Sequence, residues 1–282
     1  MTLPSWLKRK IVYEDELEET KKILNEFHLN TVCQEAKCPN IMECFCKKKA
    51  TFLALGNKCS RRCRFCNISF SKTLPPPDEK EPIFIAKCIK ALALKYAVIT
   101  MVTRDDLEDK GANHIAKIIR EIKKISLATD VEVLTSDFCG QEQLIDIVLN
   151  ENPKVFNHNL ETVKSLHKKI KPQSSYECSL KVLKYTKSKN VLVKSGFMLG
   201  LGESKEEIFQ TINDLHEVKC DIITIGQYLQ PNKKSYPVKS FVTCEQFQEY
   251  EKYSLDLGIK YVFAAPFVRS SYVEFSKIET HR

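Results

Sequence analysis

The sequence has no apolar run that approaches the roughly 18 residues needed to span a membrane. Its first residues contain neither the apolar stretch nor the small-residue cleavage site of a secretion signal, so we expect a cytoplasmic protein with no membrane partner. Low-complexity segments and short internal repeats are also missing. There is no arginine-rich tract or ladder of aromatic residues, so we expect no nucleic acid partner.

The charge balance leaves two interpretations open. The 282 residues carry a formal net charge of +8, mostly from scattered lysines. This excess is either a lysine-rich composition or the attraction of an acidic protein partner by electrostatic steering. With 43% hydrophobic residues the chain can build a core, as one large domain or two small ones.

From about residue 51, short apolar runs alternate with amphipathic segments, whereas residues 1–50 are irregular, charged and cysteine-bearing. The predicted strands are 51–56, 96–100, 131–135, 155–159, 191–199, 221–226 and 261–265, and the predicted helices include 83–94, 106–125, 141–150, 204–218 and 245–257. Regular alternation of this kind predicts parallel βα units. The spacing favours a barrel or partial barrel, and an open doubly wound sheet is the alternative.

Cysteine is abundant, with 12 residues that a cytoplasmic protein uses as thiols or metal ligands rather than in disulfides. Cys59, Cys63 and Cys66 form a C-x3-C-x2-C loop directly after a predicted strand. Three thiolates can hold a four-iron cluster and leave one iron open for chemistry. A zinc site would need a fourth ligand, and the next candidates, Cys88 and His114, lie in or beside predicted helices.

A second triad, Cys33, Cys38 and Cys44, precedes this loop with C-x4-C-x5-C spacing. It raises the same question of what occupies the fourth position. Two such triads in a chain of this size predict two iron–sulfur clusters rather than one.

A glycine-rich segment, residues 196–203, lies where a predicted strand ends and a helix begins. Its G-x3-G-x-G spacing is not the G-x-G-x-x-G of a dinucleotide site. The segment is either a close approach of backbone to a flat ligand or a tight strand-to-helix turn.

The cysteine loop, with Phe65 before its last cysteine, resembles the radical S-adenosylmethionine (SAM) superfamily, and the glycine-rich turn resembles its adenine-contacting motif. Within that superfamily the chain is most similar to the lipoyl synthase family. The segments that carry this resemblance are residues 33–44, 104–107, 156–162, 194–196, 226–231 and 268–272, and it extends from residues 4–8 almost to the C-terminus.

The resemblance implies a partial (βα)6 barrel over residues 51–265. An N-terminal extension, residues 1–50, would carry an auxiliary cluster, and a C-terminal tail, residues 266–282, would close on it. It implies two 4Fe-4S clusters and SAM as cofactors, and a sulfurtransferase that inserts sulfur at carbons 6 and 8 of a protein-bound octanoyl-lysine. The cluster on Cys59, Cys63 and Cys66 would cleave SAM to a 5′-deoxyadenosyl radical, and the auxiliary cluster would donate sulfur.

The resemblance also implies the remaining site residues. Ser270 would be the fourth ligand of the auxiliary cluster, with Ser271 the less favoured choice, because serine is a weak partner for an iron that must be released. The ends of the second and fourth strands suit SAM, since βα barrels bind substrates there. The SAM-binding residues that we predict are Thr103, Arg104, Asp105, Asn159, Glu161, Lys194 and Gly200, while His158 is structural or orients the substrate.

The expected partners are an octanoylated lipoyl-carrier domain or H-protein-like acceptor, a flavodoxin- or ferredoxin-type reductant, and a cluster-assembly carrier. The alternative enzyme is a sulfur inserter of the biotin synthase type, and the non-enzymatic alternative is a zinc-stabilised, nucleic-acid-binding protein. Some features depart from the family pattern or match no cluster spacing: Lys171-Pro172 in place of Arg-Pro, Asp109-Lys-Gly111 in place of a glycine pair, and the cysteines Cys46, Cys88, Cys139, Cys178, Cys220 and Cys244.

Overall fold

The computed structural model describes residues 2–9 and 15–271. The chain divides into two compact units. Unit 1 comprises Met1–Arg9, Cys63–Phe65 and Asn157–Arg282, and unit 2 comprises Lys10–Arg62 and Cys66–Phe156.

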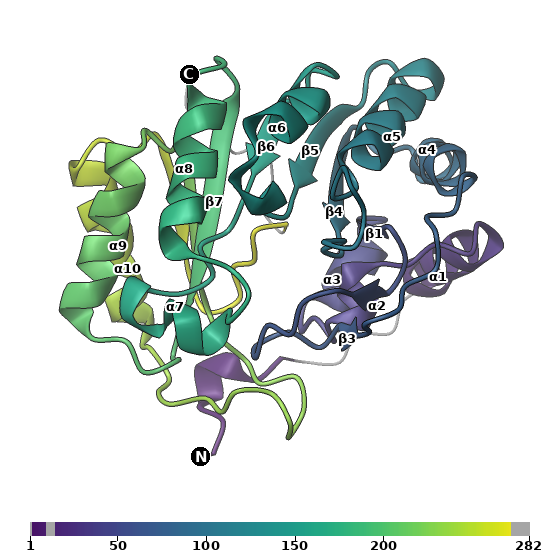
Figure 1. Ribbon diagram of the computed structural model, residues 1–282. Coiled ribbons are helices and arrows are strands. Elements are labelled where there is room, and N and C mark those ends of the chain that lie inside the picture. The colour runs from purple at the N-terminus through teal and green to yellow at the C-terminus, as the bar shows by residue number, and fades with distance from the viewer. Residues whose placement is uncertain (1, 10–14, 272–282) are drawn as a thin grey trace. The chain divides into compact units, whose positions relative to one another are not determined.

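Unit 2 contains the parallel strands β1, β4 and β5 and the helices that follow them (Figure 1). Its elements are α1 (Asp15–Glu26), α2 (Val32–Glu35), α3 (Ile41–Cys46), β1 (Thr51–Ala54), β2 (Lys58–Cys59), β3 (Ser69–Phe70), α4 (Glu81–Ala91), β4 (Tyr96–Met101), α5 (Ala112–Ile125), β5 (Asp130–Leu134), the 3-10 helix η2 (Phe138–Gly140) and α6 (Glu142–Leu149). Every residue of β1 is buried, as expected for a parallel strand covered on both faces.

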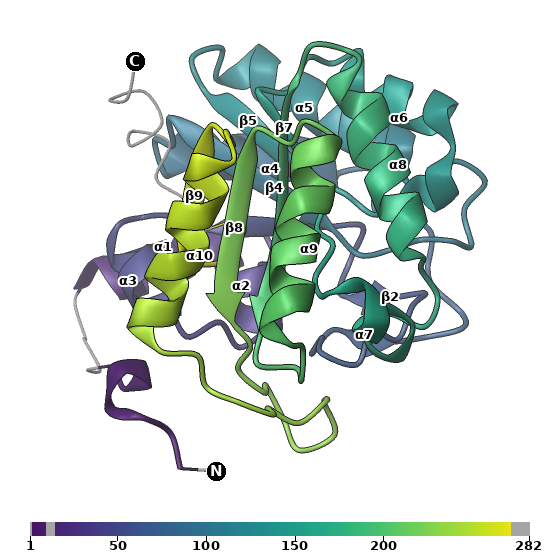
Figure 2. The same ribbon diagram turned by 90° about the vertical axis from the view of Figure 1, so that its left-hand side faces the viewer.

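Unit 1 contains the parallel strands β7, β8 and β9, and α9 and α10 lie side by side over one face of β8 (Figure 2). Its elements are the 3-10 helix η1 (Ser5–Leu7), α7 (Lys164–Ile170), α8 (Tyr176–Lys187), β7 (Leu192–Leu199), α9 (Lys205–Glu217), β8 (Ile222–Gln227), α10 (Cys244–Asp256) and β9 (Tyr261–Ala264). Both long helices begin with capping boxes, at Ser204 and Thr243, which satisfy the first backbone N–H groups. Leucine, isoleucine and valine side chains from these elements form the core.

The strand order is β1-β4-β5-β6-β7-β8-β9, and β6 (Val155–Asn157) contains the point at which the chain passes from unit 2 to unit 1. Over the described residues, helices follow β1, β4, β5, β6, β7 and β8 in turn, so the order is six βα units and a final strand. The seven strands predicted from the sequence match these seven, and the α/β fold with parallel βα units is confirmed.

Two predictions about local structure were wrong. The N-terminal 50 residues are not irregular, because α1, α2 and α3 lie in them. The helix expected from residue 106 begins at Ala112, because Lys110 and Gly111 both have positive φ, of 53° and 87°, which no helix accepts. No helix of the described residues has the length and apolar character that crossing a membrane requires.

Candidate active site

The cysteine loop is tied to the end of β4 within unit 2. Both the backbone N–H and the hydroxyl of Ser60 donate to the carbonyl oxygen of Thr103, at 2.9 Å each, and the N–H of Asp105 donates to the Ser60 hydroxyl at 3.0 Å. The sulfur of Cys59 accepts from the N–H of Arg61, and the sulfur of Cys66 accepts from the N–H two residues further on, both at 3.4 Å. N–H groups aimed at sulfur stabilise thiolate charge and tune the potential of a bound cluster.

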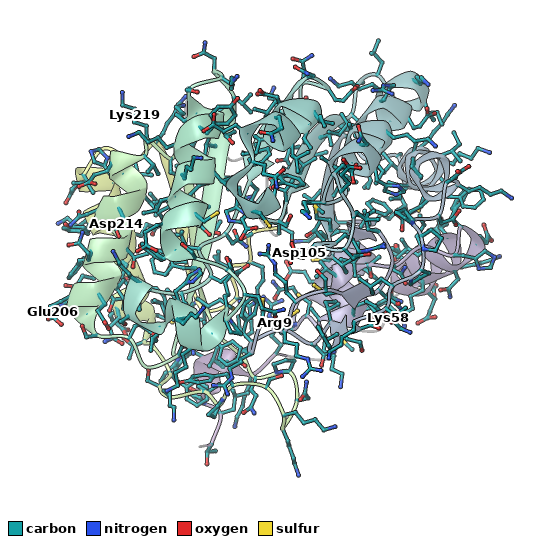
Figure 3. All side chains as sticks on the ribbon, in the orientation of Figure 1. Arg9, Lys58, Asp105, Glu206, Asp214 and Lys219 are labelled. Carbon is teal, nitrogen blue, oxygen red and sulfur yellow. The ribbon has the colours of Figure 1, made fainter. Side chains whose placement is uncertain are left out.

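The Arg61 side chain is buried between two carboxylates. It donates to both oxygens of Asp105, at 2.6 and 2.9 Å, and to both oxygens of Asp137, at 2.8 Å. These carboxylates raise the pKa of Arg61 against the opposing effect of burial, so the guanidinium stays charged. Figure 3 labels Asp105 on the loop after β4, and Asp137 lies after β5. The Arg61 side chain therefore fixes the cysteine loop to the ends of two strands.

The Arg104 side chain also makes hydrogen bonds within the protein. It is 2% exposed, and its guanidinium donates to both oxygens of Asp106 and to the carbonyl oxygen of Pro75, the latter at 2.9 Å. Arg104 and Asp105 thus have structural partners already. The role of Thr103, Arg104 and Asp105 in binding SAM stays a prediction.

The second triad lies together in unit 2. Cys33 is on α2, Cys44 is on α3, and the N–H of Cys38 between them donates to the carbonyl oxygen of Cys33 at 3.0 Å. Burial raises the pKa of Cys33 to about 11, and burial together with the neighbouring Cys33 and Cys38 raises that of Cys44 to about 12. Three thiols whose thiolate forms would repel one another suit a cluster, which would displace their protons.

In unit 1, Asn159, Glu161 and Lys171 form one hydrogen-bonded group. The Asn159 amide donates to Glu161 at 3.1 Å, and the Lys171 ammonium donates to the Asn159 carbonyl oxygen at 3.3 Å. Burial raises the pKa of Glu161, while Lys171 and Asn159 act in the opposite direction. Lysine at position 171 therefore supplies a positive charge beside the half-buried Glu161 carboxyl group, even without the bidentate geometry of arginine.

Ser270 belongs to the same group. Its hydroxyl donates to the side-chain oxygen of Asn159 at 2.8 Å and lies 3.2 Å from the Thr224 hydroxyl on β8. A Cβ on Gly196 would fall 2.2 Å from Thr224 Oγ1 and 2.7 Å from Ser270 Oγ, so only glycine leaves room for the serine. Ser271 is the last described residue, and Tyr272 lies outside the described residues.

The glycine-rich turn follows β7. Gly200 has φ of 97°, and a Cβ there would fall 2.2 Å from the Gln227 amide nitrogen, so the turn requires glycine. The Glu203 carboxylate accepts from the N–H groups of Gly200 and Leu201, which fixes the turn. Lys194, on β7, is 2% exposed.

The middle of the cysteine loop, Cys63–Phe65, belongs to unit 1. The N–H of Arg64 donates to the carbonyl oxygen of Ile170 at 2.8 Å, and its carbonyl oxygen accepts from the N–H of Tyr236 at 2.7 Å. Phe65 packs against a buried cluster, which explains the aromatic residue before the last cysteine; the cluster consists of Ile170, Leu201, Tyr228 and Tyr236.

No three His, Cys, Asp or Glu side chains within residues 2–9 and 15–271 are placed to hold one metal ion together. This is unlike a mononuclear zinc site; a four-iron cluster does not require it, because each of its cysteines binds a different iron. Of the unassigned cysteines, Cys88 and Cys220 are buried, Cys139 and Cys244 are exposed, and Cys46 and Cys178 are half-buried.

Sequence reasoning missed three residues of these groups: Asp137, Lys171 as a partner of Glu161, and Thr224. Asp137 follows β5 just as Asp105 follows β4, so its place after a predicted strand was a usable signal. Thr224 lies inside a buried strand, and no local pattern distinguishes it from a core residue.

The chain resembles known proteins over most of its length. The model of the Radical SAM superfamily matches residues 53–215. The lipoyl synthase of Protochlamydia amoebophila is 48% identical over 273 residues, which cover 95% of this chain and 84% of that protein. The lipoyl synthase of Caldicellulosiruptor saccharolyticus is 47% identical over 272 residues, covering 96% and 95%. Among solved structures, Streptococcus suis SuiB bound to S-adenosylmethionine has a TM-score of 0.60 over 93% of this chain and 64% of its own, at 14% identity, and supports the fold alone.

Proposed function

Since the chain belongs to the lipoyl synthase family of the radical SAM superfamily, we propose that it inserts two sulfur atoms, at carbons 6 and 8, into an octanoyl chain held on a lysine of an acceptor protein. It is a sulfurtransferase whose cofactors are SAM and 4Fe-4S clusters. When bound, SAM and the first cluster supply a radical that can remove hydrogen from an unactivated methylene, and the second cluster supplies sulfur.

The chain would hold the first cluster through Cys59, Cys63 and Cys66. The N–H groups aimed at the sulfurs of Cys59 and Cys66 would stabilise the thiolates. Arg61 would keep the loop in place, because both of its carboxylate partners follow strands.

The second triad is the observation that carries the proposal. Cys33 and Cys38 lie close enough to Cys44 to add to the effect of burial in raising its pKa, and the three thiols together would hold the second cluster in unit 2. Ser270 would be the fourth ligand. Its half-buried hydroxyl has Asn159 and Thr224 as partners, so release of an iron would leave it with hydrogen bonds.

For SAM we propose Thr103, Arg104 and Asp105 in unit 2 and Asn159, Glu161, Lys194 and Gly200 in unit 1. Buried amide, carboxyl and ammonium groups suit the ammonium, hydroxyl and carboxylate groups of SAM. Gly200 would let the adenine approach the backbone. Arg104 and Asp105 would keep their hydrogen bonds within the protein, so their role would be mainly to position the loop that contacts SAM.

The acceptor is an octanoylated lipoyl-carrier domain or H-protein-like protein. A flavodoxin- or ferredoxin-type protein would supply electrons, and a carrier protein would rebuild the clusters. We propose a cytoplasmic location, and a division into an N-terminal extension (1–50), a barrel (51–265) and a tail (266–282).

The experiment is anaerobic reconstitution with iron and sulfide, followed by dithionite, SAM and an octanoyl-lysyl peptide, with mass spectrometry of the peptide. We expect about eight irons per chain and a dithiolated peptide. The Cys63→Ala variant should cleave no SAM, whereas Cys38→Ala should cleave SAM and insert no sulfur. If Cys38→Ala made the full product, the second triad would not be the donor site. If sulfur entered a free small molecule and not the peptide, the biotin synthase type would be the better assignment.

A further inference from the structure

One end of unit 1 carries a concentration of exposed cations. They come from the cysteine loop, from α7 and from the loop after β8, residues 228–242; Figures 1 and 2 show α7 and that loop at the end of the unit where β8 finishes. The exposed members, which we call the basic surface, are Arg64, Lys168, Lys169, Lys233, Lys234 and Lys239.

The three segments are joined by backbone hydrogen bonds. Arg64 donates to the last residue of α7 and accepts from Tyr236 in the loop after β8, at 2.8 and 2.7 Å. The ammonium groups of Lys169 and Lys239 lie over the Tyr236 ring, 5.3 and 5.9 Å from its centre. The basic surface is therefore one structure, and the residue after Cys63 is part of it.

No acidic residue interrupts these segments. Residues 60–77, 162–176 and 228–244 contain no Asp or Glu, in a chain that has 36 of them. Lys164 of α7 forms an ion pair with Glu177, which directly follows the second of these segments. We therefore exclude Lys164 from the basic surface. These segments therefore carry an excess of positive charge beside Cys63.

The composition of the basic surface distinguishes between kinds of partner. Tight interfaces depend on buried aromatic anchors and are depleted in lysine. Here Tyr236 is buried beneath the lysines, being 8% exposed, and no aromatic residue of residues 60–77, 162–176 and 228–244 is among the exposed ones. Flexible lysines without an aromatic anchor suit a small, transient and salt-sensitive encounter, which is the usual form of an electron-transfer complex.

We propose that the basic surface docks the acidic protein that delivers electrons to the cysteine loop. The inference deepens the proposed function and depends on it for the use of the electron: one electron leaves the reduced flavin of the donor, and each SAM cleavage consumes one. Docking against Arg64 places the donor next to Cys63, so the electron has a short path and no substrate channel has to open.

The test uses the reconstituted protein and a flavodoxin with an acidic surface. The variant Lys168→Glu/Lys233→Glu changes two positions of the basic surface. The control Lys184→Glu/Lys252→Glu makes the same change in net charge at exposed positions on α8 and α10 of the same unit. Affinity for oxidised flavodoxin is measured by calorimetry at low and high ionic strength, and product formation is measured with flavodoxin or with dithionite as reductant.

We expect the surface variant to bind flavodoxin at least about tenfold more weakly at low ionic strength, with a flatter salt dependence, while the control binds like wild type. With dithionite, which needs no docking, the surface variant should form product at the wild-type rate. Equal loss of affinity in both variants, or in neither, would overturn the proposal.

A different result would show that the basic surface binds the octanoylated acceptor protein instead of the electron donor. If the surface variant, driven by dithionite, still modified an octanoyl peptide but not an octanoylated carrier domain, the basic surface would dock the acceptor and the proposal would be wrong. If wild type made no product with dithionite, the proposed function would fail, and the binding measurement would still decide whether the surface recognises the donor.

Discussion

Removing the carboxylate of Asp137 should lower the free energy of unfolding by the contribution of its ion pair with Arg61. The side chains of Arg61 and Asp137 are 6% and 3% exposed, and two hydrogen bonds of 2.8 Å join them. In the Asp137→Ala variant one oxygen also disappears as acceptor for the N–H of Cys139, at 3.0 Å. The variant therefore leaves a buried guanidinium with only the second carboxylate, on Asp105.

The magnitude follows from burial. Deleting one partner of a buried ion pair costs about 3–5 kcal/mol, because the other charge remains away from water. Asp105 is 32% exposed and still binds Arg61, so we expect the lower end, about 3 kcal/mol. The Asp137→Asn variant keeps the volume and one acceptor oxygen, so its loss of stability measures the charge and should be smaller.

The assay is urea unfolding of the iron-free protein, in which the free energy of unfolding is extrapolated to water. The matched control is Glu249→Ala, which removes a surface ion pair with Lys205 whose side chains are 45% and 49% exposed. Exposed pairs are worth at most about 1 kcal/mol. If Asp137→Ala lost no more stability than Glu249→Ala, the reasoning about the buried Arg61 would be refuted.

Three further predictions concern the serine, the glycine beside it and the buried thiols. Ser270→Ala should cleave SAM but form no sulfur product, as seen by mass spectrometry of deoxyadenosine and peptide; full product would remove Ser270 from the donor site. Gly196→Ala should destabilise the protein by about 1–3 kcal/mol in urea unfolding, since its Cβ would fall 2.2 Å from Thr224 Oγ1; an unchanged midpoint would contradict this. Burial raises the pKa of Cys88 and Cys220 to about 12 from 9.0. Above pH 9 the unfolded chain loses these protons first, so the free energy of unfolding should fall as pH rises from 9 towards 12, and less steeply in Cys88→Ala; identical pH profiles would contradict it.

Periodicity was sufficient for the sheet because buried parallel strands are continuous apolar runs. The runs at residues 96–100 and 261–265, for example, correspond to β4 and β9 within a residue. The same reasoning failed for residues 1–50. There α1 has only three buried residues among twelve, Leu17, Thr20 and Leu24. Its apolar face is too narrow to stand out as a periodic pattern among the charged residues.

For the candidate site, sequence spacing identified ligands but not their supports. Cysteine spacing reports on a local loop, whereas the partners of Arg61 lie 44 and 76 positions away along the chain. The pairing of Ser270 with Asn159 spans 111 positions. Such contacts depend on which strand ends meet, and that information is in the topology rather than in any local pattern.

In the proposed function the second cluster supplies the sulfur, so each turnover leaves a protein with an incomplete cluster. That protein has to stay folded until the cluster is rebuilt. The hydroxyl of Ser270 has two hydrogen-bond partners within unit 1, the side-chain oxygen of Asn159 at 2.8 Å and the hydroxyl of Thr224 at 3.2 Å. If Ser270 is the fourth ligand as proposed, loss of the iron would leave its half-buried hydroxyl with these two hydrogen-bond partners. We expect the spent protein to keep its fold between rounds, so that its lifetime is limited by the supply of iron and sulfide rather than by unfolding.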